Sequence, residues 1–163
     1  MSETPAIRIE RATERDVPLI LRLITGLSEY EKLAHEVTAT EAGLRETLFG
    51  PRPAADVIIA YAGAEAAGFA LFFPNFSTFL GKPGLYLEDL FVRPEWRGRG
   101  LGLALMKHLA KTAVERGCGR FEWSVLDWNP PAIGVYQGLG ARLMDGWSLG
   151  RVTGDALTRL AGS

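Results

Sequence analysis

The chain has 163 residues, the length of one ordinary domain, and its 47% hydrophobic and 23% charged residues are typical of a sequence that folds around a single core. Eighteen Lys and Arg against nineteen Asp and Glu leave a formal net charge of -1, so no overall field attracts nucleic acid or an anionic membrane. The single cysteine, Cys118, can form neither an internal disulfide nor a multi-thiolate metal site. We therefore expect one domain over residues 1–163, with no nucleic-acid or membrane partner.

The N-terminus and the apolar stretches argue against export and against a membrane span. Met1–Pro5 has no basic start and no apolar stretch behind it, so no secretory signal is expected and the protein should stay in the cytoplasm. The longest apolar region, Val57–Phe73, is interrupted by Glu65 and two glycines and is typical of two strands joined by a turn. His35 and His108 have no metal-ligand spacing, so we expect no metal.

Hydrophobic periodicity predicts the elements of the first half of the chain. Apolar and polar residues alternate over 7–11, which predicts a strand, and Thr13 with Asp16 forms a capping-box pattern ahead of a helix over 17–27. Thr40 predicts the cap of a second helix, which runs to Leu48 and stops at a glycine-proline pair. The short links of the next segments predict an antiparallel meander of three strands, over 56–61, 67–73 and 85–92.

The second half alternates helices and strands. We expect a helix, a strand, a short helix, a strand and a terminal helix, over 103–116, 121–125, 129–139, 147–152 and 155–160. Gly117 should close the first of these helices, and Thr153 should cap the last. This order predicts a mixed sheet with helices on its faces, in one domain.

The most informative stretch follows the strand at 85–92 and reads Arg97-Gly98-Arg99-Gly100-Leu101-Gly102. Its glycines let the backbone approach a ligand, and the next helix offers unpaired N–H groups and a positive dipole end. This combination is typical of a phosphate-binding loop, to which Arg93, Arg97 and Arg99 add positive charge.

Other kinds of glycine-rich loop fit this stretch less well. The alternating glycines match neither the dinucleotide fingerprint Gly-x-Gly-x-x-Gly nor the Walker loop, which ends in Gly-Lys-Ser/Thr. An Arg-Gly nucleic-acid segment would be a longer repeat in a basic, disordered context. A flexible strand-to-helix turn with solvated arginines remains as the alternative to a phosphate site.

The loop resembles the Arg/Gln-x-x-Gly-x-Gly/Ala pyrophosphate loop of the GNAT superfamily, the Gcn5-related N-acetyltransferases that use acetyl-coenzyme A. Tyr86–Val92, Trp128-Asn129 with Pro131, and Val135-Tyr136 with Gly140-Ala141 are similar to the diamine (spermidine/spermine) acetyltransferases and their thialysine-acetylating relatives. The resemblance runs over about residues 7–160. It implies the GNAT fold, a mixed α/β (α+β) fold whose central, mostly antiparallel mixed sheet is flanked by helices on both faces.

The resemblance also implies acetyl-coenzyme A as co-substrate, no metal, and pairing of the strand amides with the pantetheine arm. The coenzyme residues that it implies are Leu90, Phe91, Val92, Arg97, Gly98, Arg99, Gly100, Leu101, Gly102, Leu103, Asn129 and Ala132.

Acetyl transfer to an amine needs a neutral nitrogen, yet an alkylamine with a pKa of about 10.4 has only about one neutral molecule in 2,500 at pH 7. A carboxylate near the thioester can hold the ammonium group and receive its proton. Glu88 and Asp89 should point to opposite faces of their strand, so only one is expected to face the substrate. The resemblance favours Glu88 as the catalytic carboxylate, and the alternative is a solvated strand residue.

Two further groups complete the expected chemistry. The thioester oxygen becomes an oxyanion, which a backbone N–H near 90–92 could stabilise if the strand is splayed or bulged there. The leaving thiolate has a pKa of about 8.5, and a phenol with a pKa of about 10 can return a proton to it. Tyr136 matches the family's general acid, and the alternative is a tyrosine that only packs on a short helix.

The amine should meet acidic and aromatic side chains. The resemblance implies Tyr30, Glu31, Glu88 and Asp145 as substrate residues, and Glu122, Trp123 and Ser124 are expected beside them. Carboxylates spaced along a cleft would recognise a linear diamine by its two charges. A solvated acidic surface at Glu29, Glu31 and Glu36 is the alternative, and the family resemblance also implies a homodimer.

The sequence thus predicts an acetyl-coenzyme A dependent N-acetyltransferase that transfers the acetyl group directly to a primary amine of a small substrate. The expected substrate is a diamine or polyamine, or a thialysine-like amino acid. Acetylation of a protein or peptide amine, and a non-catalytic regulatory module that binds coenzyme A, remain as alternatives.

Overall fold

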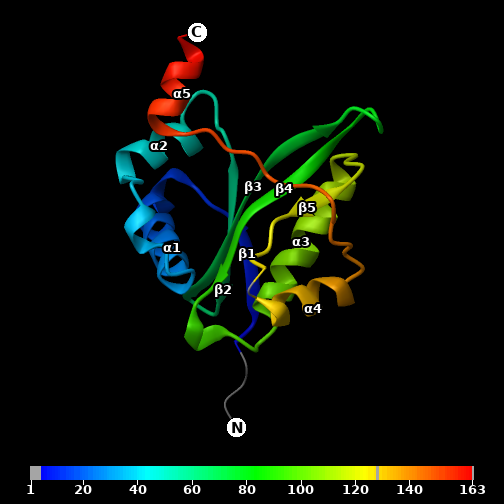
Figure 1. The fold of residues 1–163 in the computed structure, drawn as a ribbon. Coiled ribbons are helices and arrows are strands. Elements are labelled where there is room, and N and C mark those ends of the chain that lie inside the picture. Colours follow the sequence, from blue (N-terminus) through cyan, green and yellow to red (C-terminus); the bar gives the residue numbers. More distant parts are fainter. Residues whose placement is uncertain (1–4, 128, 163) are drawn as a thin grey trace. The chain divides into compact units, whose positions relative to one another are not determined.

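The computed structural model describes residues 5–127 and 129–162, which form two compact units, one up to Ser124 and one from Val125 (Figure 1). The sequence features at Met1–Thr4 and at Trp128 lie outside the described residues. Among the residues that are described, no helix has the length and apolar character needed to cross a membrane.

The first unit is built on a five-stranded sheet whose strands lie in chain order. The strands are β1 (Ile7–Arg11), β2 (Asp56–Ala62), β3 (Glu65–Ser77), β4 (Lys82–Val92) and β5 (Phe121–Trp123). β1 to β4 pair antiparallel and β5 pairs parallel to β4. The predicted meander and the mixed, mostly antiparallel sheet are therefore confirmed, although β3 and β4 are longer and β5 is shorter than the sequence pattern indicates.

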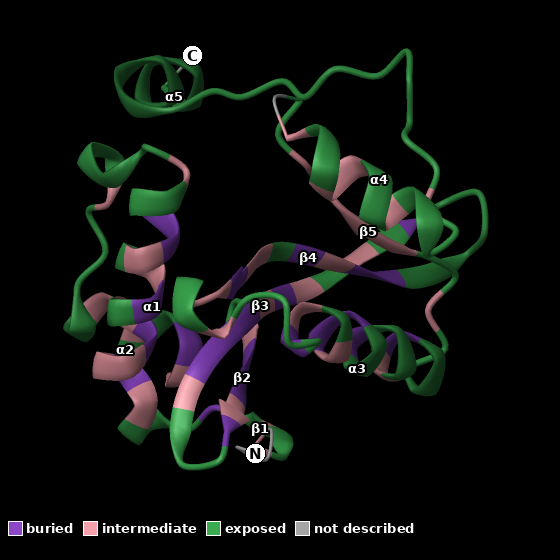
Figure 2. Ribbon diagram, turned by 90° about the horizontal axis from the view of Figure 1, so that it is seen from below, coloured by how far each residue is buried: buried purple, intermediate pink, exposed green. Residues whose placement is uncertain are grey.

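Helices cover both faces of this sheet, as the views in Figures 1 and 2 show, with α1 (Val17–Tyr30) and α2 (Glu41–Phe49) on one face and α3 (Leu101–Glu115) on the other. The predicted caps are confirmed: the Thr13 N–H donates to the Asp16 carboxylate at 2.7 Å, and the Thr40 hydroxyl accepts from the Gly43 N–H at 3.1 Å. Three short 3-10 turns, Glu14–Asp16, Ala34–Glu36 and Pro94–Trp96, link these elements.

The core beneath α1 extends directly to the part of β4 that the sequence assigns to the site. Ile20 and Leu23 of α1, Ile59 of β2 and Phe69 of β3 are at most 1% exposed, and Phe91 of β4 joins the same cluster at 5%. Figure 2 shows buried residues, in purple, along α1 and along the strands of the sheet. Each such side chain contributes roughly 1.5–3 kcal/mol on burial, so the backbone around Phe91 is anchored to a rigid support.

The second unit contains α4 (Pro130–Gly138) and α5 (Gly154–Ala161), close to the two helices predicted there. The predicted strand over 147–152 is wrong: these residues have no strand assignment, and Trp147 and Leu149 are 81% and 79% exposed. A strand needs a partner as well as a two-residue period, and alternation in the sequence reports only the period.

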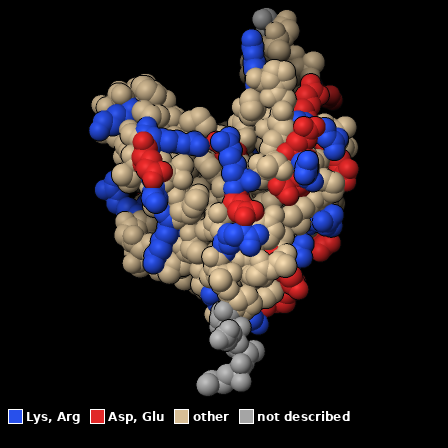
Figure 3. Space-filling view, turned by 180° about the vertical axis from the view of Figure 1, so that it is seen from behind, with Lys and Arg blue, Asp and Glu red and all other residues tan. Residues whose placement is uncertain are grey.

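Lys and Arg are interspersed with Asp and Glu on the face shown in Figure 3, and the formal net charge of the chain is -1. Any charge selectivity must therefore come from local groups.

Candidate active site

The two halves of β4 have different neighbours. Leu85–Leu87 pair with β3 on one side and with β5 on the other. β5 ends at Trp123, so among the described residues the half of β4 from Glu88 to Val92 pairs with β3 alone. One edge of the strand is thus left for a ligand, at the position where the sequence analysis expects the pantetheine arm.

A β-bulge at Glu88 separates the two halves. Leu87 lies opposite Phe72 and Asp89 lies opposite Leu71, so Glu88 has no partner on β3. An extra residue reverses the alternation of the amides along the strand. The sequence analysis allowed for a bulge at 90–92, and the structure has it two residues earlier, at Glu88.

The bulge decides which amides face the open edge. Before it, the Leu85 N–H donates to Arg120 on the β5 side at 3.1 Å; beyond it, the Arg93 N–H donates to Ala67 on the β3 side at 2.8 Å. Because amides alternate along an antiparallel ladder, Phe91 points its N–H to β3, and Leu90 and Val92 point theirs to the open edge. Two amides one residue apart can pair with an extended, amide-bearing ligand or with an oxyanion.

Acidic groups lie on the α1 side of this open half. Asp89 shares a face with Leu71, which packs on the α1 core, and Glu31 follows the last residue of α1. Burial, and after it the negative charges of Glu88 and Glu31, raise the pKa of Asp89 to about 6. Burial also raises the pKa of Glu31, whereas Glu88 is exposed. A site with these carboxylates favours a cation, and Asp89 can exchange a proton near neutral pH.

The glycine loop has the conformation that its sequence requires. Gly98 and Gly100 have φ angles of 74° and 86°, in the left-handed region that side chains other than glycine rarely adopt. Gly100 caps α3, which begins at Leu101, so the first N–H groups of α3 have no partner within the helix. The loop therefore presents backbone donors and a positive helix end, as a pyrophosphate site needs.

The two arginines of this loop lie in different surroundings. The Arg97 guanidinium lies 4.3 Å from the centre of the Tyr30 ring, and its Nε donates to the Val92 carbonyl at 3.0 Å. The Arg99 guanidinium lies 4.9 Å from the Trp96 ring, within its own loop. Of the expected substrate residues in the first unit, Tyr30, Glu31 and Glu88 thus surround the open half of β4.

The expected substrate residues at β5 lie beside the paired half of β4. The Glu122 carboxylate is bonded to Arg120 Nε at 2.7 Å and to Asn75 Nδ2 at 3.3 Å, so its charge is already balanced. The Ser124 hydroxyl is 2.7 Å from the Tyr86 hydroxyl. Trp123 is partly buried beside Phe121, with ring centres 4.9 Å apart.

The remaining expected residues belong to the second unit. Asn129 caps α4, Ala132 lies in its first turn, and Tyr136 is half-buried near its end. Asp145 is exposed in a turn before Gly146. Their roles stay predictions.

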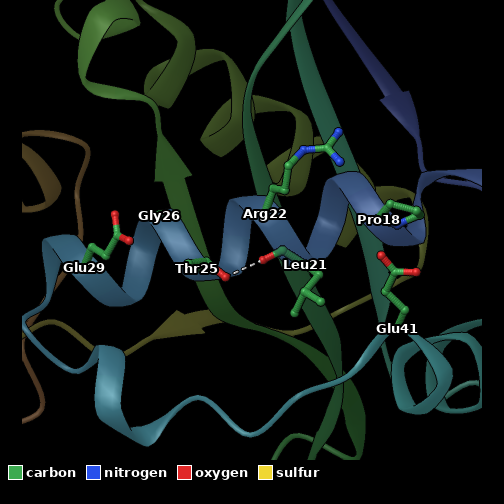
Figure 4. A pocket seen from close by; sticks show the side chains of 7 residues that line it. All are labelled: Pro18, Leu21, Arg22, Thr25, Gly26, Glu29 and Glu41. Carbon is green, nitrogen blue, oxygen red and sulfur yellow. Dashed lines mark hydrogen bonds between the residues drawn. The ribbon is translucent and has the colours of Figure 1, made fainter.

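A separate hollow of about 430 Å³ lies along α1 (Figure 4). Six of its lining residues come from α1 and one from the start of α2: Pro18, Leu21, Arg22, Thr25, Gly26, Glu29 and Glu41. It carries both charge signs and contains none of the expected catalytic, coenzyme or substrate residues, so we assign it no role in the chemistry.

Sequence reasoning missed two features of the site. It set Asp89 aside because strict alternation turns it away from Glu88, and it treated Arg97 only as a phosphate ligand. The two adjacent carboxylates before the glycine loop were a sequence signal that could have pointed to Asp89. The bulge and the stacking of Arg97 on Tyr30 have no such signal in the sequence.

Comparisons with known proteins agree with this geometry. The model of the "Acetyltransferase (GNAT) family" matches residues 24–141. A thialysine N-epsilon-acetyltransferase of Sus scrofa is 38% identical, over 96% of this chain and 98% of the relative, and the L-ornithine N5-acetyltransferase of Arabidopsis thaliana is 37% identical, over 92% and 86%.

A solved structure extends the agreement to the fold. An integron cassette protein from the mobile metagenome of V. cholerae superposes with a TM-score of 0.81 at 31% identity, over 96% of this chain and 98% of that one. With an open strand edge, a glycine loop and a family match that runs through both, this chain belongs to the acetyltransferase (GNAT) family and is an N-acetyltransferase.

Proposed function

We propose that the protein transfers an acetyl group from acetyl-coenzyme A directly to a primary amine of a small cationic substrate, a diamine or polyamine or an amino acid with an aminoalkyl side chain. The observation that carries the proposal is the acidic surrounding of the open half of β4, where Glu31, Glu88 and Asp89 interact. The relatives named for ornithine N5 and thialysine N-epsilon acetylation support an amine at the end of a side chain.

Acetyl-coenzyme A fits the residues present. The amides of Leu90 and Val92 suit the pantetheine arm, and the N–H groups of the loop from Gly98 to Leu103 suit the pyrophosphate. The bound coenzyme supplies a thioester carbon that an amine can attack.

Side chains of the protein then accept and donate the protons of the reaction. The amine nitrogen bonds to the carbonyl carbon, the carbon–sulfur bond breaks, and a carboxylate takes the proton that the amine gives up. Holding a neutral amine at pH 7 costs about 4–5 kcal/mol for a group with a pKa near 10.4, which is why the carboxylate matters. We propose Glu88 for this role, with Asp89 as the second candidate, because the bulge brings both next to the open edge.

We propose Tyr136 as the acid that returns a proton to the leaving thiolate, on the match of its sequence surroundings to the family. Tyr136→Phe should then lower kcat by about a hundredfold or more while coenzyme binding is kept. Tyr61→Phe, on β2, is the matched control. Equal rates for Tyr136→Phe and the wild type would remove Tyr136 from the mechanism.

The substrate class is tested by release of the coenzyme thiol with ornithine, thialysine, spermidine and lysine-containing peptides. We expect turnover with at least one small amine at a kcat/KM well above that for any peptide. Turnover with peptides alone would identify a protein acetyltransferase, and coenzyme binding without any turnover would identify a regulatory module.

We further propose that the protein is cytoplasmic and a homodimer, and that residues 1–163 form one catalytic domain. The family match over residues 24–141, which runs through both units, supports the last point. Sedimentation of the purified chain tests the dimer.

A further inference from the structure

Arg97 joins the glycine loop to the end of α1. Its guanidinium lies 4.3 Å from the Tyr30 ring centre and 5.7 Å from the Phe91 ring centre, and its Nε donates to the Val92 carbonyl at 3.0 Å. These contacts hold one side chain against the last residue of α1 and two residues of β4. A planar guanidinium can stack on a ring and at the same time donate a hydrogen bond in its own plane to a carbonyl, whereas a lysine ammonium cannot.

These contacts engage the Nε and one face of the Arg97 guanidinium before any phosphate binds. Its Nε is already bonded and it lies over two rings, so a phosphate would have to compete with these contacts. Arg99 contacts only Trp96 within its own loop and has no hydrogen bond or ion pair to the part of the chain that the structure describes. The loop N–H groups and Arg99 can therefore serve the pyrophosphate without Arg97.

Tyr30 lies at the boundary of the acidic surroundings. It is 44% exposed, it ends α1, and Glu31 follows it with a partly buried carboxylate. Directly afterwards the chain turns through Lys32, whose φ of 61° is in the left-handed region. The Tyr30 ring therefore contacts the guanidinium of Arg97 directly before this turn of the backbone.

We propose that Arg97 is a positioning residue for the amine: through Tyr30 it holds the Tyr30-Glu31 end of α1 against the strand that binds the coenzyme. The inference deepens the proposed function and rests on it. It changes the expected role of Arg97 from a coenzyme ligand to a determinant of amine affinity.

The test compares two arginines of one loop. Arg97→Lys keeps the charge and loses the planar stack, and should raise the KM for the amine about fivefold, the effect of one exposed cation–π contact, while calorimetry shows the Kd for coenzyme A changed less than about twofold. Arg99→Ala, the matched variant, should show the reverse, with weaker coenzyme binding and a smaller change in the amine KM. A coenzyme Kd weakened fivefold or more by Arg97→Lys, with the amine KM unchanged, would overturn the proposal.

A double-mutant cycle isolates the contact with Tyr30. Tyr30→Leu removes the ring and should raise the amine KM, and Arg97→Lys should add little in that background because the stack is already lost. Tyr30→Phe keeps the ring and should recover much of the loss that Tyr30→Leu causes. Additive effects of Arg97→Lys and Tyr30→Leu would contradict a shared role.

The same double-mutant cycle of Arg97 and Tyr30 can also be measured by stability, from the midpoints of urea unfolding, and this needs no substrate. Wild-type protein that binds coenzyme A but acetylates no amine would refute the proposed function. In that case, coupling between Arg97 and Tyr30 together with an unchanged coenzyme Kd would still support the positioning role, and absence of coupling would refute it.

Discussion

The two halves of β4 show how one strand serves two purposes. Leu85–Leu87 are paired on both sides, and the polar groups beside them on β5 satisfy one another, as Arg120 and Glu122 do at 2.7 Å. From Glu88 to Val92 the strand has one partner strand, two outward amides and a set of interacting carboxylates. The difference arises from the extra residue Glu88 and from the shortness of β5. The bulge at Glu88 turns the amides of Leu90 and Val92 outward, and β5 ends before it could pair with them.

The largest effect is expected from adding a side chain at Gly68 of β3, which lies opposite Val92 in the open half of β4. A Cβ on Gly68 would lie 2.5 Å from the Phe91 carbonyl oxygen and 3.2 Å from the Val92 Cα, and backbone cannot yield easily. Gly68→Ala should lower the free energy of unfolding by about 2–4 kcal/mol and weaken coenzyme binding, because Leu90 and Val92 move with their neighbours. Urea unfolding and calorimetry measure the two effects.

Gly84, one residue before the paired half of β4, supplies the control. A Cβ there would lie 2.2 Å from Asn75 Oδ1, which belongs to a side chain that can rotate, and we expect a smaller loss of stability with coenzyme affinity kept. If Gly84→Ala weakened the coenzyme as much as Gly68→Ala, the two halves would not be functionally distinct.

A second prediction concerns the charge of the open half. Burial raises the pKa of Asp89 to about 6 in the folded protein, above the ordinary pKa of about 4 in an unfolded chain, so between about pH 4 and pH 6 the unfolded chain releases this proton before the folded one does. The free energy of unfolding that the Asp89 carboxyl contributes therefore falls as the pH rises from about 4 to about 6, and it stays lower at higher pH. Asp89→Asn should flatten the slope and raise stability at pH 7.5 by up to about 3 kcal/mol, less to the extent that water screens the site.

Urea unfolding at pH 4.5 and pH 7.5 measures this slope, with Glu88→Gln as the exposed neighbour that should change it less. The expected effect on activity is opposite to the effect on stability: Asp89→Asn should lower the catalytic rate if this carboxyl takes the proton from the amine. An unchanged slope in Asp89→Asn would mean that burial does not hold this group protonated.

Much of the fold could be predicted because it depends on local patterns. Period, caps and glycine positions predicted α1, α2, α3 and the meander. The alternating glycines predicted a loop that a ligand can approach, and the positive φ angles of Gly98 and Gly100 were added by the structure. The strand predicted at 147–152 failed because a pattern names no partner for a strand. Alternation also failed at Glu88, since nothing local marks an inserted residue.

The sequence predicted the types of residue in the candidate site better than their arrangement in space. Carboxylates and arginines could be named from their sequence surroundings, but whether an arginine meets phosphate or an aromatic ring depends on residues 67 positions apart, as for Arg97 and Tyr30. Glu122 was also named for the substrate, and the fold pairs it with Arg120 and with Asn75, which is distant in the sequence; its role at the substrate stays a prediction.

The smallest effect is expected from Glu122, which lies on β5 opposite Tyr86 in the paired half of β4. Glu122→Gln keeps an acceptor for Asn75 and loses the ion pair with Arg120, whose two side chains are 40% and 37% exposed. Pairs at this exposure contribute about 0–1 kcal/mol, so the stability loss should be small and should shrink further in high salt. Because that carboxylate is already balanced, Glu122→Gln should also raise the amine KM less than Glu31→Gln, whose charge has no basic partner within hydrogen-bond or ion-pair distance among the described residues. Equal increases in KM would show that the amine reaches past the open half of β4 and takes its charge partner from the paired half.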